Sequence, residues 1–512
     1  MRHDADCTLT LAAAWALFAL CCISPIVWML FGTAGSGSLS AAAVGLADER
    51  QRSLMVNTLS LGAGVTALAF VIGAPAGMIL ARCHPRRVWF LRFVLAVPLV
   101  LPSYVLGLAW VVLFGARPSV WVYSMPAAVA VLGFSLYPIV MLATEAALRT
   151  VPARLEEAGR LAASPTRVFL KITLPLLTAA LSASLLIVFV LAISDFAVPG
   201  LLRVRVYTTE VFTAFAALYD FRLATVMALP LAGVAALASI AALRFARRPL
   251  TARTDRGKSG GRWNDSAQQF AVACMLVVAI AMVGLPIASV GFEARGGRAA
   301  YVDAVSIDAL RNSFVWSAAG ASIVVLIGTL LGYWRRKAAP RFAHLAEGVW
   351  VTLFAVPATI VGIGIIALWN RPGILGDIYQ TGAIVVIAYV SRFLPIGALL
   401  CGAFLRRVPV GVEEAASVAG ASWTGIFARI IVPMSRGGLT GVWLVMFILM
   451  FGDVALAILV SPPGESNLAV RAYTLIANSP TGDVARLAVV QIAVTVLPLV
   501  VLALIARQQE LA

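Results

Sequence analysis

Three ionisable residues lie inside long apolar runs of this sequence. Asp195 and Asp453 occupy equivalent places near the ends of two runs, and Arg392 lies within a third. Ionisable groups are costly in an apolar environment and usually face a pathway or one another. The two carboxylates are therefore candidate pore-lining residues, although the pattern favours structural hydrogen bonds or an interfacial position. Arg392 could pair with Asp453, but the favoured interpretation is that its long side chain extends to an interface.

Two polar segments between apolar runs share one pattern. Each begins with a Val-Pro pair, continues with two glutamates and several small residues, and ends before a second proline. The candidate functional residues are Glu156, Glu157, Ala158, Ala163 and Pro175 in the first segment, and Glu413, Glu414, Ala415, Ala416, Gly420 and Pro433 in the second.

The physical chemistry of these segments predicts a short surface helix in each. Pro152 and Pro409 suit the opening of a helix because their fixed φ is already helical. The paired glutamates then fall in the first turn, where the helix dipole favours anions. The small residues that follow leave a flat face for a partner, and Gly420 is suited to end the second helix. We therefore expect two docking helices.

Long apolar runs make up most of the remaining sequence. Hydrophobic residues are 61% of the 512 residues and charged residues 12%, whereas soluble domains carry about 25% charged residues. The runs are continuously apolar rather than alternating, which favours helices over barrel strands. This predicts an all-α integral membrane protein with about 12 transmembrane helices, since each span needs about 20 apolar residues. The expected spans are 8–31, 58–80, 93–114, 120–143, 176–198, 224–243, 270–291, 314–333, 348–369, 381–404, 438–460 and 486–506.

The net charge of +16 is unevenly distributed along the chain. If the segments between spans alternate from an inside N-terminus, nearly all of the positive excess falls on the inside segments. This agrees with the positive-inside rule and predicts cytoplasmic N- and C-termini in a bacterial inner membrane. The basic residues are explained by topology, and no nucleic-acid-binding module is expected.

The chain repeats itself with a period of about 257 residues. Each half contains six spans in the same order, so the halves have the same orientation and form a parallel repeat. We assign residues 1-243 to the first half, 244-269 to a basic cytoplasmic linker and 270-512 to the second half. The matching residues are Asn57-Thr58 and Asn312-Ser313, Pro98 and Pro357, Pro138 and Pro395, and Asp195 and Asp453. The four prolines predict bends in their spans.

Sites for nucleotides, metals and cofactors are not expected in this chain. Gly257-Lys258-Ser259 resembles the end of a phosphate-binding loop, but Ala252 stands where that motif needs glycine. The six cysteines and three histidines show no metal-ligand spacing. If ATP drives this protein, a separate subunit must bind it.

The two polar segments resemble the Glu-Ala-Ala…Gly…Pro motif of permeases from binding-protein-dependent ABC importers. Glu414-Ala415-Ala416, Gly420 and Pro433 match it fully, whereas the first copy is one residue short at the glycine position. The resemblance implies a type I permease fold, in which each short helix is a cytoplasmic coupling helix that docks on an ATP-binding subunit. It also implies two copies of that subunit, a periplasmic or lipid-anchored binding protein, and no enzymatic activity in the permease itself.

Two fused six-span halves are most similar to the ferric iron permease family, which implies iron(III) uptake. Thiamine, polyamine and phosphonate permeases remain alternatives within the class. An ion-coupled secondary transporter can also have six plus six spans in parallel repeat. The paired docking motifs, and the shortage of buried residues for a proton or sodium relay, argue against it.

Overall fold

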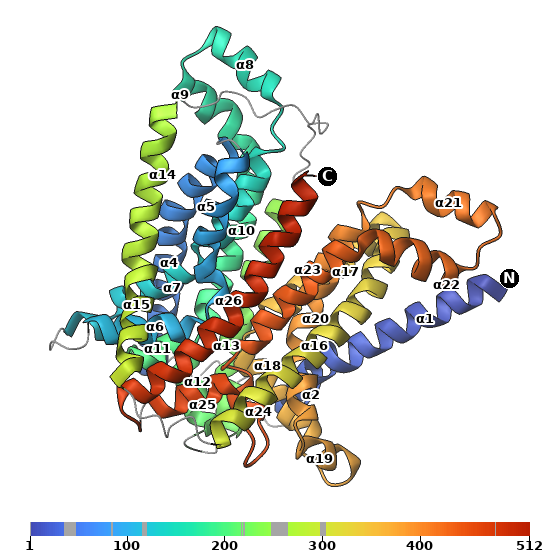
Figure 1. The fold of residues 1–512 in the computed structure, drawn as a ribbon. Helices are drawn as coiled ribbons and strands as arrows, with labels where there is room; N and C mark the ends of the chain where they lie inside the picture. The colour runs from blue at the N-terminus through green and yellow to red at the C-terminus, as the bar shows by residue number, and fades with distance from the viewer. Residues whose placement is uncertain are drawn as a thin grey trace.

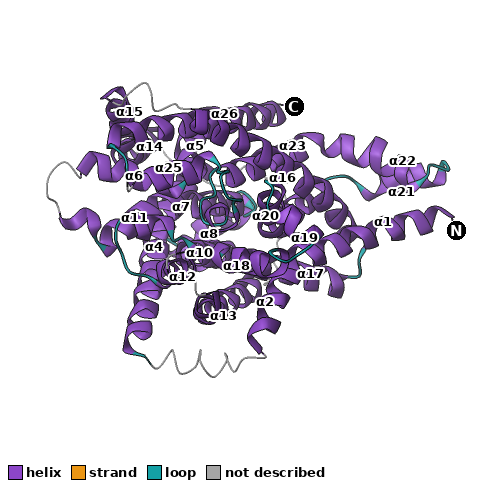
Figure 2. Ribbon diagram, turned by 90° about the horizontal axis from the view of Figure 1, so that it is seen from below, coloured by secondary structure: helices purple, strands orange, loops and turns teal. Residues whose placement is uncertain are grey.

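The computed structural model describes residues 2–34, 48–82, 85–114, 120–216, 218, 221–246, 265–296, 304–476 and 478–511. These residues form helices without any strand (Figures 1 and 2). Within them, ten helices are long and apolar enough to cross a membrane, or up to twelve if each of two bent pairs is one span. The predicted all-α membrane fold is confirmed. Most of the predicted linker 244-269 lies outside the described residues.

The first half follows the predicted order of spans, with short helices between them. Its helices are α1 (Arg2–Phe18), α2 (Ser24–Ala34), α4 (Glu49–Arg82), α5 (Pro85–Val100), α6 (Ser103–Phe114), a 3-10 turn (Val120–Tyr123), α7 (Met125–Leu148), α8 (Ala153–Ala162), α9 (Pro165–Val168), α10 (Leu174–Ser194), α11 (Ala197–Leu201), α12 (Tyr207–Ala216) and α13 (Phe221–Ala246).

The second half repeats this order. Its helices are α14 (Asp265–Ala279), α15 (Leu285–Gly296), α16 (Ala304–Lys337), α17 (Pro340–Ala355), α18 (Ala358–Trp369), α19 (Ile374–Tyr379), α20 (Ala383–Leu405), α21 (Val410–Val418), α22 (Trp423–Ile426), α23 (Val432–Phe451), α24 (Ala457–Val460), α25 (Leu468–Ile476) and α26 (Thr481–Leu511).

Two predicted spans are broken rather than merely bent. Phe90–Val100 and Ser103–Phe114 replace the predicted span 93–114 and lie at 92° to each other, and Pro340–Ala355 and Ala358–Trp369 replace 348–369 at 93°. The breaks fall at Pro102 and Pro357, because proline has no amide hydrogen and disfavours helix in the residue before it. In the first half the matching Pro98 stays inside α5, so the break comes about one turn later than the repeat predicts.

Four other prolines are accommodated without a break. Each follows a π-helical turn, whose extra residue moves the preceding carbonyl away from the proline ring. The helix therefore continues across the proline and still counts as one candidate span. The turns are Ala19–Ile23, Phe169–Thr173, Ile280–Gly284 and Phe427–Ile431, and they precede Pro25, Pro175, Pro286 and Pro433.

The first span of each half packs against the other half. Trp15 in α1 contacts Trp334 and Trp350, with ring centroids 4.9 and 6.0 Å away. In return, the indole of Trp110 in α6 donates a hydrogen bond to the carbonyl of Met282 at 3.1 Å, between α14 and α15. Both first spans also contribute residues to the apolar core of the opposite half. The first span of each half therefore contacts both halves and connects them across the boundary seen in the sequence.

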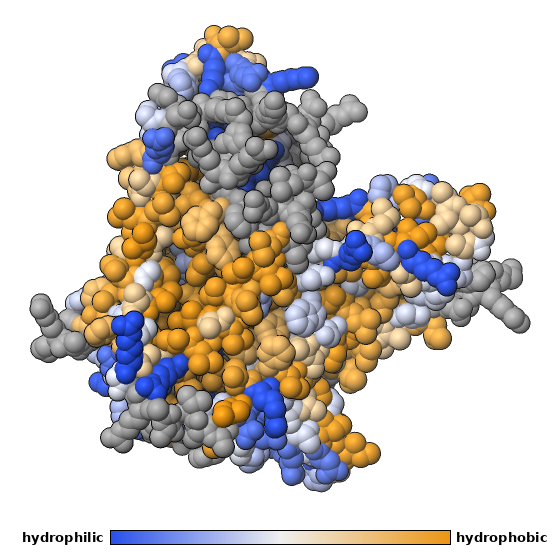
Figure 3. Space-filling model, viewed as in Figure 1, coloured by the Kyte–Doolittle hydropathy of each residue, from blue (hydrophilic) through white to orange (hydrophobic). Residues whose placement is uncertain are grey.

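The helices form two arms that diverge towards one side (Figure 1). The wide side carries α8 and α9 on one arm and α21 and α22 on the other, and the arms meet near α11, α12, α24 and α25. A broad apolar surface lies between more hydrophilic ends (Figure 3). The two hydrophilic ends are therefore the regions expected to face water on either side of a bilayer.

We predict that the side bearing α8 faces the cytoplasm. In a background without the native cysteines, Glu465→Cys should react with an impermeant thiol reagent in intact spheroplasts, whereas Ser164→Cys should react only after permeabilisation. Both side chains are exposed, so access across the membrane decides the result. Labelling of Ser164→Cys alone in intact spheroplasts would reverse the assigned orientation.

Candidate functional site

The two predicted short surface helices are present as α8 and α21, at the far ends of the two arms (Figure 1). Pro152 and Pro409 precede their first residues, so the helices open where the sequence predicts. Gly420 lies just beyond α21 with φ +83°, and the amide of Ala421 donates to the carbonyl of Ala416 at 3.1 Å. This is a glycine-dependent helix end, as expected.

The end of α8 differs because the glycine position is missing from the first motif. Ala163 follows the helix in an extended conformation, with φ −152° and ψ 159°. Its backbone therefore suits any residue, including a β-branched one. Pro175 and Pro433 lie further along, each the second residue after a π-helical turn.

The first glutamate of each pair, a candidate for docking an ATP-binding subunit, is buried inside the chain. Glu156 is 4% exposed and receives hydrogen bonds from Arg82 at 3.1 Å and from Thr173 at 2.8 Å. Arg82 is the last residue of α4. This contact ties α8 to the end of a membrane span.

Glu413 makes the equivalent contact in the second half. It is 7% exposed and lies 2.7 Å from the ammonium of Lys337, the last residue of α16, while the hydroxyl of Tyr333 also donates to it. Burial raises the pKa of Glu413, but the hydrogen bonds from Lys337 and Tyr333 outweigh burial, and the pKa lies below its ordinary value. Ala416 is half-buried and packs against a small apolar core that includes Tyr333.

The outward faces of α8 and α21 carry matching residues. Glu157 and Ala158 are exposed in α8, as are Glu414 and Ala415 in α21. An aliphatic side chain stands at the end of each helix in the same place of the repeat. Leu161 is 92% exposed and Val418 is 91% exposed. Neither side chain is among the candidate residues chosen from the sequence. An aliphatic residue on an otherwise polar surface helix is the signal that could have indicated them.

The candidate pore residues lie where helices end rather than inside spans. α10 ends at Ser194, and the carboxylate of Asp195 accepts hydrogen bonds from the Ser103 hydroxyl at 2.6 Å and the Val198 amide at 2.9 Å. The Asp195 carbonyl accepts from the hydroxyl of Thr208 at 3.1 Å. Asp195 therefore organises the turn into α11 and connects it to the start of α6.

Asp453 has the same place after α23, with a different partner. Its carboxylate accepts a hydrogen bond from the Leu456 amide at 2.8 Å and lies 4.0 Å from Nε of Arg392. Arg392 is 8% exposed and donates to the carbonyl of Val356 at 2.9 Å, at the break between α17 and α18. The interpretation that Arg392 extends to an interface is wrong. We call Asp195, Asp453 and Arg392 the central charge cluster.

The central charge cluster lies where the two halves meet. Asp195 belongs to the first half, yet its carboxylate interacts electrostatically with Arg392 of the second half. Gly452 brings the second half so close to the first that an added Cβ would lie 2.8 Å from the Pro102 ring. Nearby, Tyr473 contacts the rings of Tyr104 and Phe196, with centroids 6.2 and 5.7 Å away.

Several polar residues around the cluster were missed from the sequence. Tyr104 donates to Gln491, whose amide donates to the carbonyl of Phe451 at 3.3 Å. Asn467 is fully buried and bonds the Tyr389 hydroxyl at 2.8 Å. An isolated amide such as Gln491 within an apolar run could have indicated these residues, because a buried polar group requires a hydrogen-bond partner.

The family described as "Binding-protein-dependent transport system inner membrane component" matches the chain twice, over residues 73–251 and 306–509. The Fe(3+)-transport system permease protein FbpB 2 of Haemophilus influenzae is 21% identical and covers 83% of this chain and 84% of its own length. The putative ferric transport system permease protein FbpB 1 of the same organism is 24% identical, covering 77% and 68%.

A shorter relative matches only part of the chain. The spermidine/putrescine transport system permease protein PotC of Escherichia coli is 22% identical over 40% of this chain and 75% of its own length. The double family match confirms the repeat that the sequence shows and excludes an ion-coupled secondary transporter. With its two matched regions and its predominantly helical membrane fold, this chain belongs to the family of inner-membrane components of binding-protein-dependent transport systems.

Proposed function

We propose that this chain is the transmembrane pore subunit of an ATP-driven importer of iron(III). A periplasmic or lipid-anchored binding protein delivers the cargo to the narrow side of the arms, and two copies of an ATP-binding subunit dock on α8 and α21. The matched outward faces of these two helices carry the proposal, because two identical partners need two similar surfaces. ATP hydrolysis takes place in the partners and not in this chain.

The iron assignment rests on the relatives that span both halves. Proteins named as ferric permeases align with most of this chain, whereas PotC aligns with less than half of it. A polyamine, thiamine or phosphonate cargo is the weaker alternative, since the polyamine permease PotC aligns with only 40% of this chain. Uptake of radioactive iron(III) by a deletion strain carrying this chain, with its partner subunits, tests the assignment directly.

Each docking helix is suited to transmit movement because it is fixed at one face and free at the other. The ion pairs Glu156–Arg82 and Glu413–Lys337, each with a buried carboxylate, fix α8 and α21 to the ends of α4 and α16. The free faces end in Leu161 and Val418, whose burial against a partner would each contribute about 1.5–3 kcal/mol. A partner that moves the helix therefore moves the span attached to it.

The central charge cluster is proposed to close the pathway at the narrow side. Asp195 and Arg392 come from different halves, so separating the halves at this side breaks their attraction. Other interactions have to replace this attraction when the halves separate. The cluster thereby favours the closed arrangement until another energy source acts.

We predict that Gly420→Val uncouples ATP hydrolysis from uptake, whereas Ala163→Val couples normally. Valine at φ +83° costs more than the roughly 1–2 kcal/mol of a left-handed residue, because its branched side chain clashes with the backbone. Valine at the extended Ala163 is unstrained. Uptake and ATPase activity of reconstituted complexes, with assembly checked separately, measure both variants. Normal coupling in Gly420→Val, with loss in Ala163→Val, would contradict the proposed docking element.

For the central charge cluster, Asp453→Asn is expected to destabilise the permease by about 3 kcal/mol, because it leaves the buried Arg392 without its partner. Adding Arg392→Ser, the residue type of the matching Ser135, should restore the melting temperature. Uptake should stay low in this double variant, and ATPase activity should no longer depend on the binding protein. Recovery of normal uptake along with stability would limit the cluster to a structural role.

A further inference from the structure

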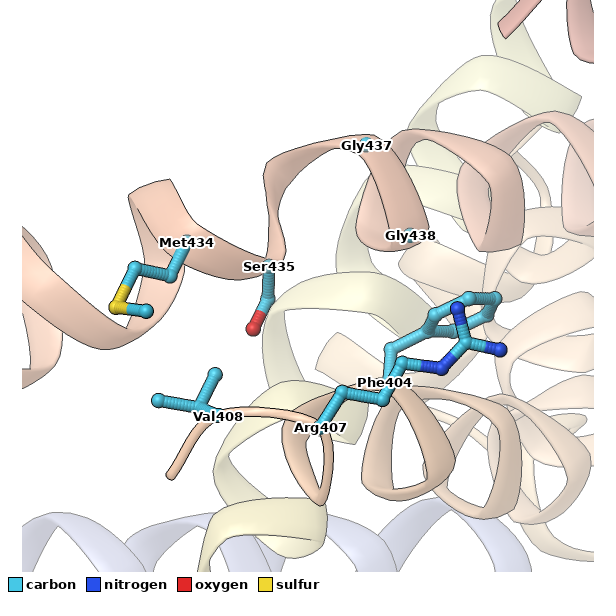
Figure 4. A pocket seen from close by; sticks show the side chains of 7 residues that line it. All are labelled: Phe404, Arg407, Val408, Met434, Ser435, Gly437 and Gly438. Carbon is cyan, nitrogen blue, oxygen red and sulfur yellow. The ribbon is translucent and has the colours of Figure 1, made fainter. Parts of the chain in front are cut away.

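A cavity of about 290 Å³ lies between the end of α20 and the start of α23, on the wide side of the second half (Figure 4). It is close to the docking helix, since Val408 in its wall directly precedes Pro409 and α21. The residues around it are Phe404, Arg407, Val408, Met434, Ser435, Gly437 and Gly438.

The cavity combines apolar walls with two hydrogen-bond donors, the buried hydroxyl of Ser435 and the exposed guanidinium of Arg407. Ser435 is 6% exposed, and its hydroxyl, which points into the cavity (Figure 4), makes no hydrogen bond within the described part of the chain. The exposed guanidinium of Arg407 stacks over the Phe404 ring, 4.7 Å from its centroid. A buried hydroxyl without a partner is costly, so this site calls for a ligand with acceptor oxygens.

Glycine is required for this arrangement at one position. A Cβ on Gly438 would lie 2.3 Å from the Phe404 ring, a distance that carbon atoms do not reach in proteins. The missing side chain therefore lets Phe404 lie flat against α23. The ring in turn supports the guanidinium of Arg407 at the mouth of the cavity.

The first half has no such donors at the matching positions. There, Leu177 replaces Ser435 and is 1% exposed, so an aliphatic side chain fills the space. Thr150 replaces Arg407, and its hydroxyl already donates to the carbonyl of Ala147 at 2.7 Å. The two donors are thus a feature of the second half alone.

We propose that this cavity binds the phosphate of an anionic phospholipid from the cytoplasmic leaflet. Its place on the cytoplasmic side rests on the proposed function. Arg407 and Ser435 would donate to the phosphate oxygens, since guanidinium groups bind phosphate well. Met434, Val408 and Phe404 would contact the glycerol and the upper acyl chain. Basic pockets between spans on this side of a membrane are suited to such headgroups.

A lipid fits this site better than an ATP-binding partner does. Two identical partners present the same groups to both halves, but the donors occur in one half only. The lipid would also join the end of α20 to the start of α23, which flank the segment carrying α21. Anionic lipid is therefore a regulator of how firmly this docking helix is held, and so of the rate of ATP-driven transport.

The test uses the assembled transporter in nanodiscs of phosphatidylcholine, with or without phosphatidylglycerol. The informative variant is Arg407→Thr with Ser435→Leu, which copies the first half and fills the cavity with a residue that packs well there. The control is Arg436→Thr, which removes an exposed cation that does not line the cavity. Native mass spectrometry of the purified permease counts retained phosphatidylglycerol independently of activity.

Phosphatidylglycerol should raise the ATPase rate of the wild type and of Arg436→Thr several-fold. The double variant should show no increase and should lose one retained lipid. An equal response in the double variant, or an equal loss in Arg436→Thr, would overturn the site. If millimolar inorganic phosphate replaces phosphatidylglycerol in neutral nanodiscs, the ligand is a soluble phosphate rather than lipid. Failure of iron uptake in all samples would refute the proposed function while the lipid count still tests the cavity.

Discussion

In the hydrocarbon core of a bilayer, each backbone amide and carbonyl has to find its partner within the protein. Prolines and helix ends are the places where this requirement is hardest to meet, and much of the architecture follows from how they are treated. A π-helical turn carries the helix through Pro25, Pro175, Pro286 and Pro433. Where the helix does break, side chains form the hydrogen bonds that the backbone groups need. Asp195 and Asp453 accept amides at two helix starts, and Arg392 satisfies the carbonyl of Val356.

The broken segments are gathered on the narrow side, where the two arms meet. The polar groups needed to satisfy these breaks therefore lie between the halves and can respond when the halves move. The continuous helices, by contrast, extend to the wide side and end at Arg82 and Lys337. There the ion pairs to Glu156 and Glu413 attach the surface helices. One end of the molecule is thus rich in breaks and buried charge, and the other presents rigid helices to a partner.

The sequence predicts the features that depend on local chemistry. Apolar runs are sufficient to find the spans, and the repeat is sufficient to match Asp195 with Asp453. The positive φ of Gly420 follows from its position after a short helix. Proline alone, however, does not tell a π-helical turn from a right-angle break. Pro175 and Pro102 look alike in sequence, and only the surrounding packing decides between these outcomes.

Features that depend on distant partners could not be predicted. Burial of Glu156 and Glu413 requires knowing that Arg82 and Lys337 end the spans beneath them. Arg392 was misjudged because its two neighbours, Asp453 and the carbonyl of Val356, come from other helices. The packing of the first spans against the opposite half cannot be predicted from the sequence, since an apolar helix can pack against either set of neighbours.

That packing has a consequence for how the protein is made. α1 is synthesised before α16 and α17, whose surfaces receive Trp15 and emerge only after the first half. Until then, α1 lacks the rings of Trp334 and Trp350 as neighbours, while the first half lacks the hydrogen bond that Met282 will accept from Trp110. Joining both halves in one polypeptide guarantees that each first span meets the opposite half, in equal number and at high local concentration.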